Sequence, residues 1–421
     1  MLKIFLFNFG MKNNILKKTF FRFNVFFFLF LLISCSSILA QESLSNKEEK
    51  KLYEYLHNGF NFFVQNKTKE ALHEYKKALK IDPNNHNAYY NSGLLYAKTK
   101  QFDEAISTVN KALLNCKEDL GSFYRLKANC FSDMGRYTEA LPLFFKDLEG
   151  GSKDSLNVNY NVGYTYFMLK DYKNALFYLN KFIERKPLND RQYKEAYFYI
   201  GNCYMELRDC RNAIQYYDLA LADNKLFRCY YNKAEALSQL KRNEEAIATI
   251  TEGINNNPDK EILYHKRYQI YRDIKEKDKS FEDLKKAYSI NPNEPDVLFD
   301  MGTYYSEDNR MDDAIKCYHR CISLNQNLIG SYNNLANIYN DNKLRSDSAE
   351  FYHKKAIDLA PDRGSSYYNF ANYYRNIDQY DQAIALYKIA IEKTPDLSIA
   401  YTNMGIAYSL KKDIGQAIKC V

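Results

Sequence analysis

The chain has 421 residues, of which 26% are charged and 16% are aromatic, and it contains no tryptophan. Its formal net charge is +7, but residues 1–40 hold five basic residues and no acid, so 54 basic and 52 acidic residues remain beyond them. A nearly neutral chain without a stripe of basic and aromatic residues lacks the charge pattern of a nucleic-acid-binding protein. We therefore expect no nucleic-acid partner.

Residues 1–40 predict a targeting segment. A basic leader precedes a nine-residue apolar run at 25–33, which is short for a membrane span and typical of a secretory signal core. The following Leu32-Ile33-Ser34-Cys35 resembles a bacterial lipobox. This resemblance implies that Cys35 carries a lipid anchor, which would place the protein in the bacterial cell envelope as a periplasmic or outer-membrane lipoprotein. Two alternatives stay open, namely secretion after cleavage following Ala40, and an uncleaved signal anchor.

After an expected linker at 41–51, a small residue returns at intervals of 33 to 38 positions. Such a spacing over some 350 residues is typical of a repeat architecture. The series consists of Ala71, Ala105, Ala140, Ala175, Ala213, Ala246, Ser280, Ala314, Ala349, Ala383 and Ala417.

A second small residue precedes most members of this series by 12 positions, and an aromatic residue usually follows it three positions later. Offsets of three, four and seven place residues on one helical face, so each unit is predicted to hold two amphipathic helices that approach closely at the small residues. Proline often closes a unit because it cannot continue a helix. The second small residues are Gly59, Gly93, Ala128, Gly163, Gly201, Ala234, Gly302, Ala371 and Gly405, with Ala336 one position further away.

This pattern resembles the tetratricopeptide repeat family. Residues 364–397 illustrate it, with Tyr367, Ala371, Ala383, Ala390 and Pro395 at the places that the family uses. The resemblance implies an all-α fold, an α-solenoid superhelix of about eleven helical hairpins over 52–421 with an incomplete last repeat. The expected units are 52–85, 86–120, 121–155, 156–193, 194–226, 227–260, 261–294, 295–328, 329–363, 364–397 and 398–421.

Three departures from the repeat predict bends. The seventh unit has Tyr268 where a small residue belongs, next to Arg267, and Ser280 in the alanine series, so we expect its hairpin to splay. The third unit has Asp147 at an alanine place, and the fourth is lengthened near 189–193.

No chemistry-bearing motif interrupts the repeats. The sequence contains no glycine-rich phosphate loop, nucleophile elbow or HExxH pair, so we expect no enzyme, no cofactor and no metal site. The eight cysteines beyond Cys35 do not follow the repeat and are predicted to be small buried residues, although Cys203 and Cys210 could bridge a hairpin turn.

Asparagine recurs on the first helix of many units, two residues before the small residue and again one residue after it. In the family this face lines the inside of the superhelix, and the resemblance implies an amide ladder that grips extended peptide segments through their backbone. Such a ladder is expected to lie away from the packed face; the alternative is that asparagine is merely common in this chain. The candidate ligand-binding residues are Asn91, Asn161, Asn232, Asn333, Asn334, Asn337, Asn340, Tyr368, Asn369, Asn372, Arg375 and Asn403.

These observations favour a non-enzymatic scaffold that binds other proteins or extended peptide segments in a concave groove. The alternative is the sensor half of a signalling protein whose downstream kinase or DNA-binding domain is missing, since the last unit stops at Val421 when its second helix has barely begun.

Overall fold

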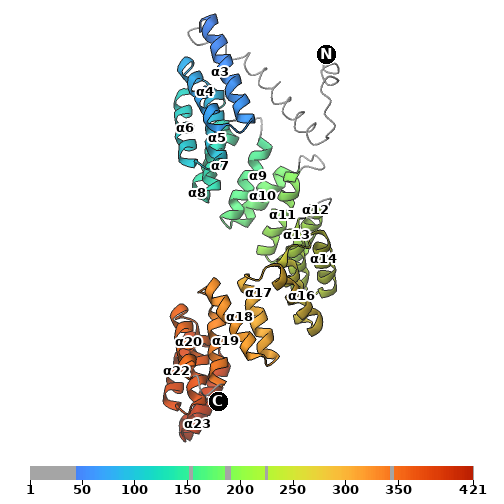
Figure 1. The fold of residues 1–421 in the computed structure, drawn as a ribbon, viewed down its shortest axis with the longest axis vertical. Coiled ribbons are helices and arrows are strands. Elements are labelled where there is room, and N and C mark those ends of the chain that lie inside the picture. Colours follow the sequence, from blue (N-terminus) through green and yellow to red (C-terminus); the bar gives the residue numbers. More distant parts are fainter. Residues whose placement is uncertain (1–43, 151–154, 185–190, 223–225, 342–345, 421) are drawn as a thin grey trace. The chain divides into compact units, whose positions relative to one another are not determined.

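The computed structural model describes residues 44–150, 155–184, 191–222, 226–341 and 346–420, and within these ranges it contains 22 α-helices and no strand (Figure 1). The predicted signal segment with Cys35, and part of the insertion at 189–193, lie outside the described residues. Among the residues described, no helix combines the length and the apolar character needed to cross a bilayer.

The helices alternate between two sets, and within residues 44–150 and 191–420 each first helix packs on the second helix that follows it, so the prediction of an all-α repeat array is confirmed. The first helices of the hairpins are α3 (Asn46–Val64), α5 (His86–Lys98), α7 (Leu120–Asp133), α9 (Ser155–Met168), α11 (Arg191–Glu206), α13 (Phe227–Gln239), α15 (Glu261–Asp273), α17 (Pro295–Glu307), α19 (Ile329–Asp341), α21 (Gly364–Asn376) and α23 (Ser398–Leu410). The second helices are α4 (Thr68–Ile81), α6 (Phe102–Asn115), α8 (Tyr137–Glu149), α10 (Tyr172–Ile183), α12 (Cys210–Leu221), α14 (Asn243–Asn256), α16 (Lys277–Ile290), α18 (Met311–Leu324), α20 (Ser346–Leu359), α22 (Tyr380–Lys393) and α24 (Ile414–Lys419).

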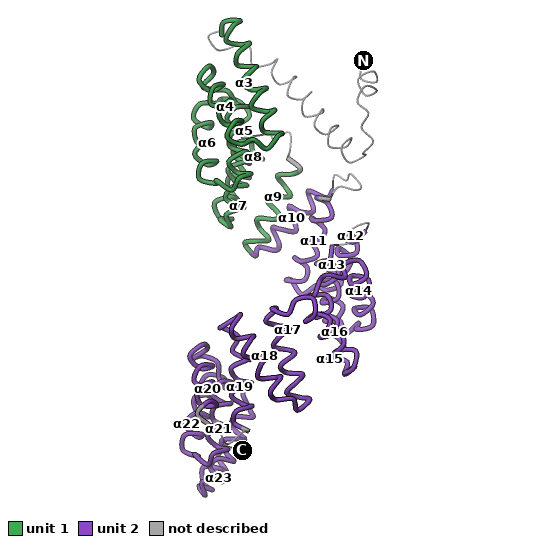
Figure 2. Tube along the Cα trace, viewed as in Figure 1, with its two compact units in different colours: residues 1–169 green, residues 170–421 purple. Residues whose placement is uncertain are grey.

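The chain divides into two compact units, residues 1–169 and 170–421, which Figure 2 draws in different colours. The first helix begins at Asn46, earlier than the residue 52 expected for the first repeat. Ser45 and Glu48 explain the difference, because they form a reciprocal capping box that satisfies the free amides of the first turn.

The small residues let a large ring on the second helix lie against the backbone of the first. At Gly201 an added Cβ would stand 2.6 Å from the Tyr217 ring, and at Gly302 it would stand 2.7 Å from the Tyr318 ring. Both tyrosines lie four residues after a small residue of the second helix and are almost completely buried. The close approach predicted from the sequence is therefore confirmed. The small residue on the first helix leaves the space that the tyrosine ring of the second helix fills.

Ten of the eleven expected units have this turn within the described residues, and in each of them one residue adopts the left-handed conformation, five positions before the small residue of the second helix. Gly135 fills this place in the third unit, with φ of 74°. Side chains other than glycine are strained by about 1–2 kcal/mol in this conformation. The other units place Asn66, Lys100, Lys170, Arg208, Lys241, Lys275, Asn309, Asp378 and Lys412 there.

We expect Lys241→Gly to stabilise its hairpin by about 0.5–1 kcal/mol, because the relief of left-handed strain exceeds the extra chain entropy of glycine. The matched change is Gly135→Ala, where an added Cβ meets nothing within 4 Å, so it should destabilise through strain alone. Hydrogen exchange of the two helices that flank each turn would measure both effects. Equal exchange before and after each change would show that these turns relax without cost.

The predicted splaying of the seventh hairpin is wrong. Tyr268 is buried, and α15 and α16 remain packed on each other. The reason is a compensating exchange, since the place that Tyr217 occupies on the second helix of the fifth unit holds the smaller Leu284 here. The bulky ring has moved from one helix of the hairpin to the other.

In the third unit the buried Asp147 is accommodated by residues of α7. Gly121 leaves room for its carboxylate, since an added Cβ would stand 2.5 Å from Oδ1, and Arg125 Nη1 lies 3.6 Å from Oδ2. An acid at an alanine place is thus matched by a cation on the facing helix.

The cysteines behave as predicted for small buried residues. Six of the eight that the structure describes are buried, and all eight are free thiols, including Cys203 and Cys210. Burial raises the pKa of the Cys203 thiol to about 12 and that of Cys130 to about 11, which keeps both protonated and unreactive.

Candidate ligand-binding surface

Within residues 170–421 successive first helices contact each other, apart from α15 and α17, so their facing residues form two stretches of shared surface, from α11 to α15 and from α17 to α23. The contacts join α11 to α13, α13 to α15, α17 to α19, α19 to α21 and α21 to α23. Recurring asparagines lie on these helices, and at the contacts of α11 with α13 and of α21 with α23 one asparagine from each helix bonds the other. We call the surface formed by them the amide ladder and define it by Asn202, Asn232, Asn334, Asn337, Asn369, Asn372 and Asn403.

The fifth and sixth hairpins show how the ladder is built. Asn202 Oδ1 accepts a hydrogen bond from the Tyr217 hydroxyl at 2.7 Å and a second from Asn232 Nδ2 at 2.8 Å. Asn202 and Asn232 come from consecutive first helices, whereas Tyr217 comes from the second helix between them. The amide therefore joins three helices at one point.

The same arrangement recurs in the tenth and eleventh units. Asn372 Oδ1 accepts from the Tyr387 hydroxyl at 2.5 Å and from Asn403 Nδ2 at 3.1 Å. Asn403 Nδ2 also donates to the Tyr368 hydroxyl at 2.9 Å, so both of its N–H groups have acceptors. Tyr368 in turn packs against the Tyr387 ring, with the ring centroids 6.0 Å apart.

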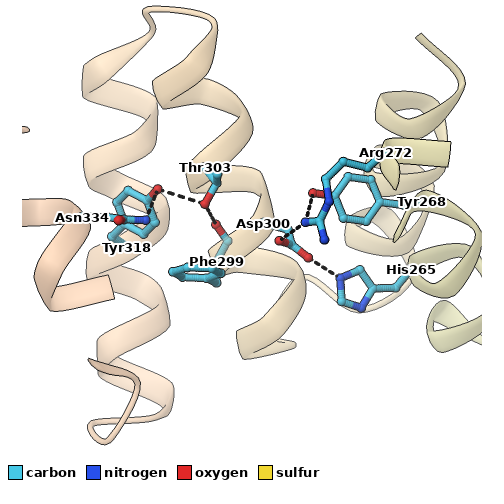
Figure 3. A network of polar contacts seen from close by, with 8 residues as sticks. All are labelled: His265, Tyr268, Arg272, Phe299, Asp300, Thr303, Tyr318 and Asn334. Carbon is cyan, nitrogen blue, oxygen red and sulfur yellow. Dashed lines mark hydrogen bonds and ion pairs between the residues drawn. The ribbon is translucent and has the colours of Figure 1, made fainter. Parts of the chain in front are cut away.

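In the eighth and ninth units a threonine replaces one amide. The Tyr318 hydroxyl lies 3.2 Å from Thr303 Oγ1 and accepts from Asn334 Nδ2 at 2.9 Å (Figure 3). The N-terminal unit shows partial forms of the same contact. Asn161 Nδ2 lies 3.3 Å from Asn129 Oδ1.

Asn91 faces the buried Tyr75 of the preceding hairpin, but that hydroxyl has no hydrogen bond of good geometry within the described residues. Asn91 nevertheless opposes the rise in the pKa of Tyr75 that burial causes. The contact thus follows the ladder pattern in a weaker form.

Burial keeps the ladder hydroxyls protonated. It raises the pKa of Tyr387 to about 12 and that of Tyr217 further still, because the phenolate would lose its hydration in these positions. Each hydroxyl therefore remains a hydrogen-bond donor at neutral pH, which fixes the orientation of the amide that accepts from it.

The expectation that the amides lie away from the packed face is wrong for Asn161, Asn232, Asn334, Asn372 and Asn403. These side chains are partly buried and bonded between helices. An asparagine between two backbones can satisfy a tyrosine hydroxyl and a second amide together, which an apolar side chain cannot do. Their binding of a ligand stays a prediction.

The other predicted residues of α19 and α21 differ in exposure. Asn337 is exposed, Asn340, Asn369 and Arg375 are partly buried, and Asn333 is buried with an Oδ1 that has no partner among the described residues. Asn337 follows a small residue as Asn202 and Asn372 do, but no hydrogen bond joins its side chain to another residue of the described ranges. The exposed Asn337 side chain is therefore available to a ligand without the loss of a hydrogen bond to the described residues.

Charged residues replace the amides in the sixth and seventh units. Lys266 Nζ donates to Glu235 across the contact between α13 and α15. Lys266 holds the position of Asn232 on its helix, and Glu235 holds the position of Asn202. Burial alone would raise the pKa of Glu235, but hydrogen bonds from Lys266 and Gln239 outweigh it and lower that pKa. This part of the ladder is an ion pair at neutral pH.

A network around Asp300 joins the seventh and eighth units (Figure 3). His265 Nε2 lies 2.7 Å from Asp300 Oδ2, and Arg272 Nη1 lies 3.3 Å from Oδ1 and 3.2 Å from the Tyr268 hydroxyl. The helices α15 and α17 pack less closely than the other successive first helices within residues 170–421. The network therefore bridges the looser contact with ionic interactions.

The recurrence along the sequence predicts the asparagines but not their partners. A tyrosine four residues after the small residue of the second helix was a visible signal, since it recurs as Tyr75, Tyr217, Tyr318 and Tyr387. Glu235, Lys266 and Asp300 were also missed, because only their positions in the ladder, and not their types, relate them to the asparagines. No group of metal-ligating side chains occurs within the described ranges.

Comparison with family models gives matches along much of the chain. A model described as "TPR repeat" matches residues 61–100, and two described as "Tetratricopeptide repeat" match residues 354–385 and residues 86–118, 264–294, 295–328 and 329–363. Residues 168–253 match a model described as "Anaphase-promoting complex, cyclosome, subunit 3".

Among curated proteins, the chain is similar to the Hsp70-Hsp90 organising protein of Plasmodium falciparum (isolate 3D7), with 27% identity over 181 residues and 39% of this chain covered. The match spans 28% of the length of that relative. Among solved structures, yeast Tom70 is 16% identical with a TM-score of 0.39, and the match covers 89% of this chain and 91% of that chain.

The Pseudomonas aeruginosa pilF structure is 17% identical with a TM-score of 0.43, covering 52% of this chain and 97% of that chain. The P58(IPK) TPR domain is 18% identical with a TM-score of 0.35, covering 86% and 98%. The matched repeat models, together with the recurring hairpins and their small-residue contacts, show that this chain carries tetratricopeptide repeats and folds as an α-solenoid.

Proposed function

We propose that the protein is a non-enzymatic scaffold that binds extended segments of other proteins along the amide ladder. The observation that carries this proposal is the fixed orientation of the ladder amides. Asn202 and Asn372 use their oxygens internally and keep their N–H₂ groups, whereas Asn232 keeps its oxygen. Donors and acceptors thus remain on one surface, where the N–H and C=O groups of a peptide backbone can pair with them.

Pre-orientation favours such binding. The tyrosines that hold the amides are buried, so the amides lose little conformational freedom when a ligand arrives. Amides that pair with a peptide backbone do not read its side chains, which supports a broad rather than a narrow choice of partners. The relative found among curated proteins is named as an organiser of two other proteins, and this also supports a scaffold role here.

The exposed Asn337 gives the sharpest test. Peptides of about 15 residues, roughly 50 Å when extended, would be selected from a random displayed library on the full chain and measured by fluorescence anisotropy. We expect Asn337→Trp to weaken the selected peptides at least tenfold. Lys316→Trp is the matched control, because Lys316 is exposed on the second helix α18 and lies off the ladder. Binding along the ladder would be contradicted if both variants lowered the peptide affinity equally, or if neither variant lowered it.

We also propose that the protein is anchored to a membrane of the bacterial envelope through Cys35. The basic leader, the short apolar run and the Leu-Ile-Ser-Cys stretch support this proposal. Cys35→Ala should move the protein from the membrane fraction to the soluble fraction, since stable anchoring needs more than one acyl chain and this variant would carry none. A mature N-terminus at Gln41 without lipid, found by mass spectrometry, would support secretion instead.

A further inference from the structure

The junction between the seventh and eighth hairpins differs from the other junctions within residues 191–420. Here α15 and α17 pack less closely than other successive first helices, and α16 packs less closely on α17 than any other second helix of this range packs on the first helix that follows it. The amide ladder is therefore divided into two stretches at this point. A joint with little packing is the place where a stack of repeats bends most easily.

The polar contact at this junction also departs from the ladder. Gln269 and Asp300 hold the two places at which asparagines of α11 and α13 bond each other. Asp300 instead bonds side chains on either side of Gln269. His265 Nε2 lies 2.7 Å from its Oδ2, and Arg272 Nη1 lies 3.3 Å from its Oδ1 (Figure 3). The long arginine side chain can span helices that lie too far apart for two short amides.

The Asp300 carboxylate is the point that these contacts share. Its side chain is only 11% exposed, and the side chain of His265 is equally buried. His265 is also stacked on Tyr268 of its own helix, with the ring centroids 5.6 Å apart. A buried carboxylate is stable only when it is paired and hydrogen-bonded, so Asp300 favours the arrangement in which α15 supplies its partners.

Apolar contacts between α16 and α17 supply a pivot. The Phe281 ring stacks on the Tyr304 ring, with centroids 3.7 Å apart and planes inclined by 4°. Met301 of α17 is buried in the same hydrophobic cluster as Leu284 of α16. Apolar contacts have no preferred direction and survive a small rotation, whereas the hydrogen bonds and ion pairs of Asp300 do not.

We infer that this junction is a hinge and that Asp300 is the latch that holds it closed. With the latch engaged, α15 and α17 keep one relative orientation. Without the carboxylate, the hairpins on either side turn about the contact of α16 with α17. The two stretches of the ladder can then present more than one spacing to a bound segment. This consequence rests on the proposed function, whereas the hinge itself does not.

Distances between spin labels would test the hinge in the full chain without any ligand. Ala248, Lys316 and Ala385 are exposed, and each lies two residues after the small residue of its second helix, in the sixth, eighth and tenth hairpins. Labels attached through an introduced unnatural amino acid leave the native cysteines unmodified. The pair at 248 and 316 spans the junction, and the pair at 316 and 385 is the control on one side of it.

In the unchanged chain the two pairs should give distance distributions of similar width. Asp300→Leu should broaden the distribution of the pair that spans the junction by about twofold and leave the control pair unchanged. This variant should fold, because His265 can stay neutral and the half-exposed Arg272 can be hydrated. Arg272→Gln removes one of the two partners and should broaden the distribution less.

Lys266→Met is the matched control variant. It removes the ion pair of Lys266 with Glu235 between α13 and α15, which also lies between the labels at 248 and 316. These two helices pack on each other, so the variant should leave the width unchanged. Broadening equal to that of Asp300→Leu would overturn the location of the hinge.

Three further results would overturn the latch. These are an unchanged width in Asp300→Leu, a broadening of both label pairs in that variant, and a junction pair that is already broader than the control pair in the unchanged chain. Failure of the chain to bind any selected peptide would overturn the proposed function and leave the hinge standing.

Discussion

Arg267→Met should lower the stability of the seventh hairpin by about 3–5 kcal/mol, the cost typical of removing one partner from a buried ion pair. Arg267 Nε and Nη2 donate to the two carboxylate oxygens of Asp283 at 2.7 Å and 2.8 Å, and Nη1 donates to Thr251 at 2.9 Å. The Asp283 side chain is 8% exposed. Without the guanidinium, the buried Asp283 carboxylate would lose its ionic partner and two hydrogen bonds.

The double variant Arg267→Met, Asp283→Leu separates charge from packing, because it removes both members of the pair. We expect it to recover most of the loss. Hydrogen exchange of α15 and α16 in the full chain is the suitable measurement, since a long repeat array need not unfold in one step. A double variant as unstable as the single one would show that the arginine acts through packing alone.

Acidification should destabilise the ninth hairpin through His353. This side chain is completely buried against Phe370 and Tyr373, and neither ring nitrogen has a hydrogen-bond partner among the described residues. Burial lowers its pKa to about 4, whereas an unfolded histidine titrates near 6.5. Between these two pH values the unfolded chain binds a proton at His353 that the folded chain does not bind. The free energy of unfolding therefore has its full value above about pH 6.5 and falls by roughly 3 kcal/mol as the pH falls to about 4.

His353→Leu should remove this part of the pH dependence while keeping an apolar side chain at the site. The exposed His73 provides the control, and His73→Leu should leave the profile unchanged. Hydrogen exchange of α19 to α21 at several pH values would measure the difference between each variant and the unchanged chain, which cancels the carboxylates that titrate in all three. An identical slope for His353→Leu and the unchanged chain would contradict the assignment.

The fold could be predicted because its determinants are local and repeated. A small residue such as Gly201 and its partner Ala213 recur at fixed spacing, and each pair fixes the closest approach of two helices that are neighbours in the sequence. The seventh unit shows the limit of this reasoning. Tyr268 violates the pattern taken alone, but Leu284 compensates for it on the other helix. A rule for single positions cannot see such an exchange.

The candidate site could be predicted only in part. The asparagine positions were visible, but their burial and their partners depend on contacts between residues about 15 to 35 positions apart, such as Asn202 with Tyr217 and Asn372 with Asn403. Spacing relates the asparagines to one another along the chain. It does not reveal which hydroxyl enters from the second helix.

The sequence by itself determined the helical hairpins, their number and the small residues at which they close, because hydrophobic periodicity and close packing act within one repeat of about 34 residues. Only the tertiary structure decided which polar groups of the ladder form internal hydrogen bonds or ion pairs and which stay available to a ligand. It turned the Asn372 oxygen inward toward Tyr387 and Asn403, matched Arg272 with Asp300, and left Arg375 without an acid. Hydrogen bonds and ion pairs are short-range and directional, so their partners are settled only when neighbouring repeats stack.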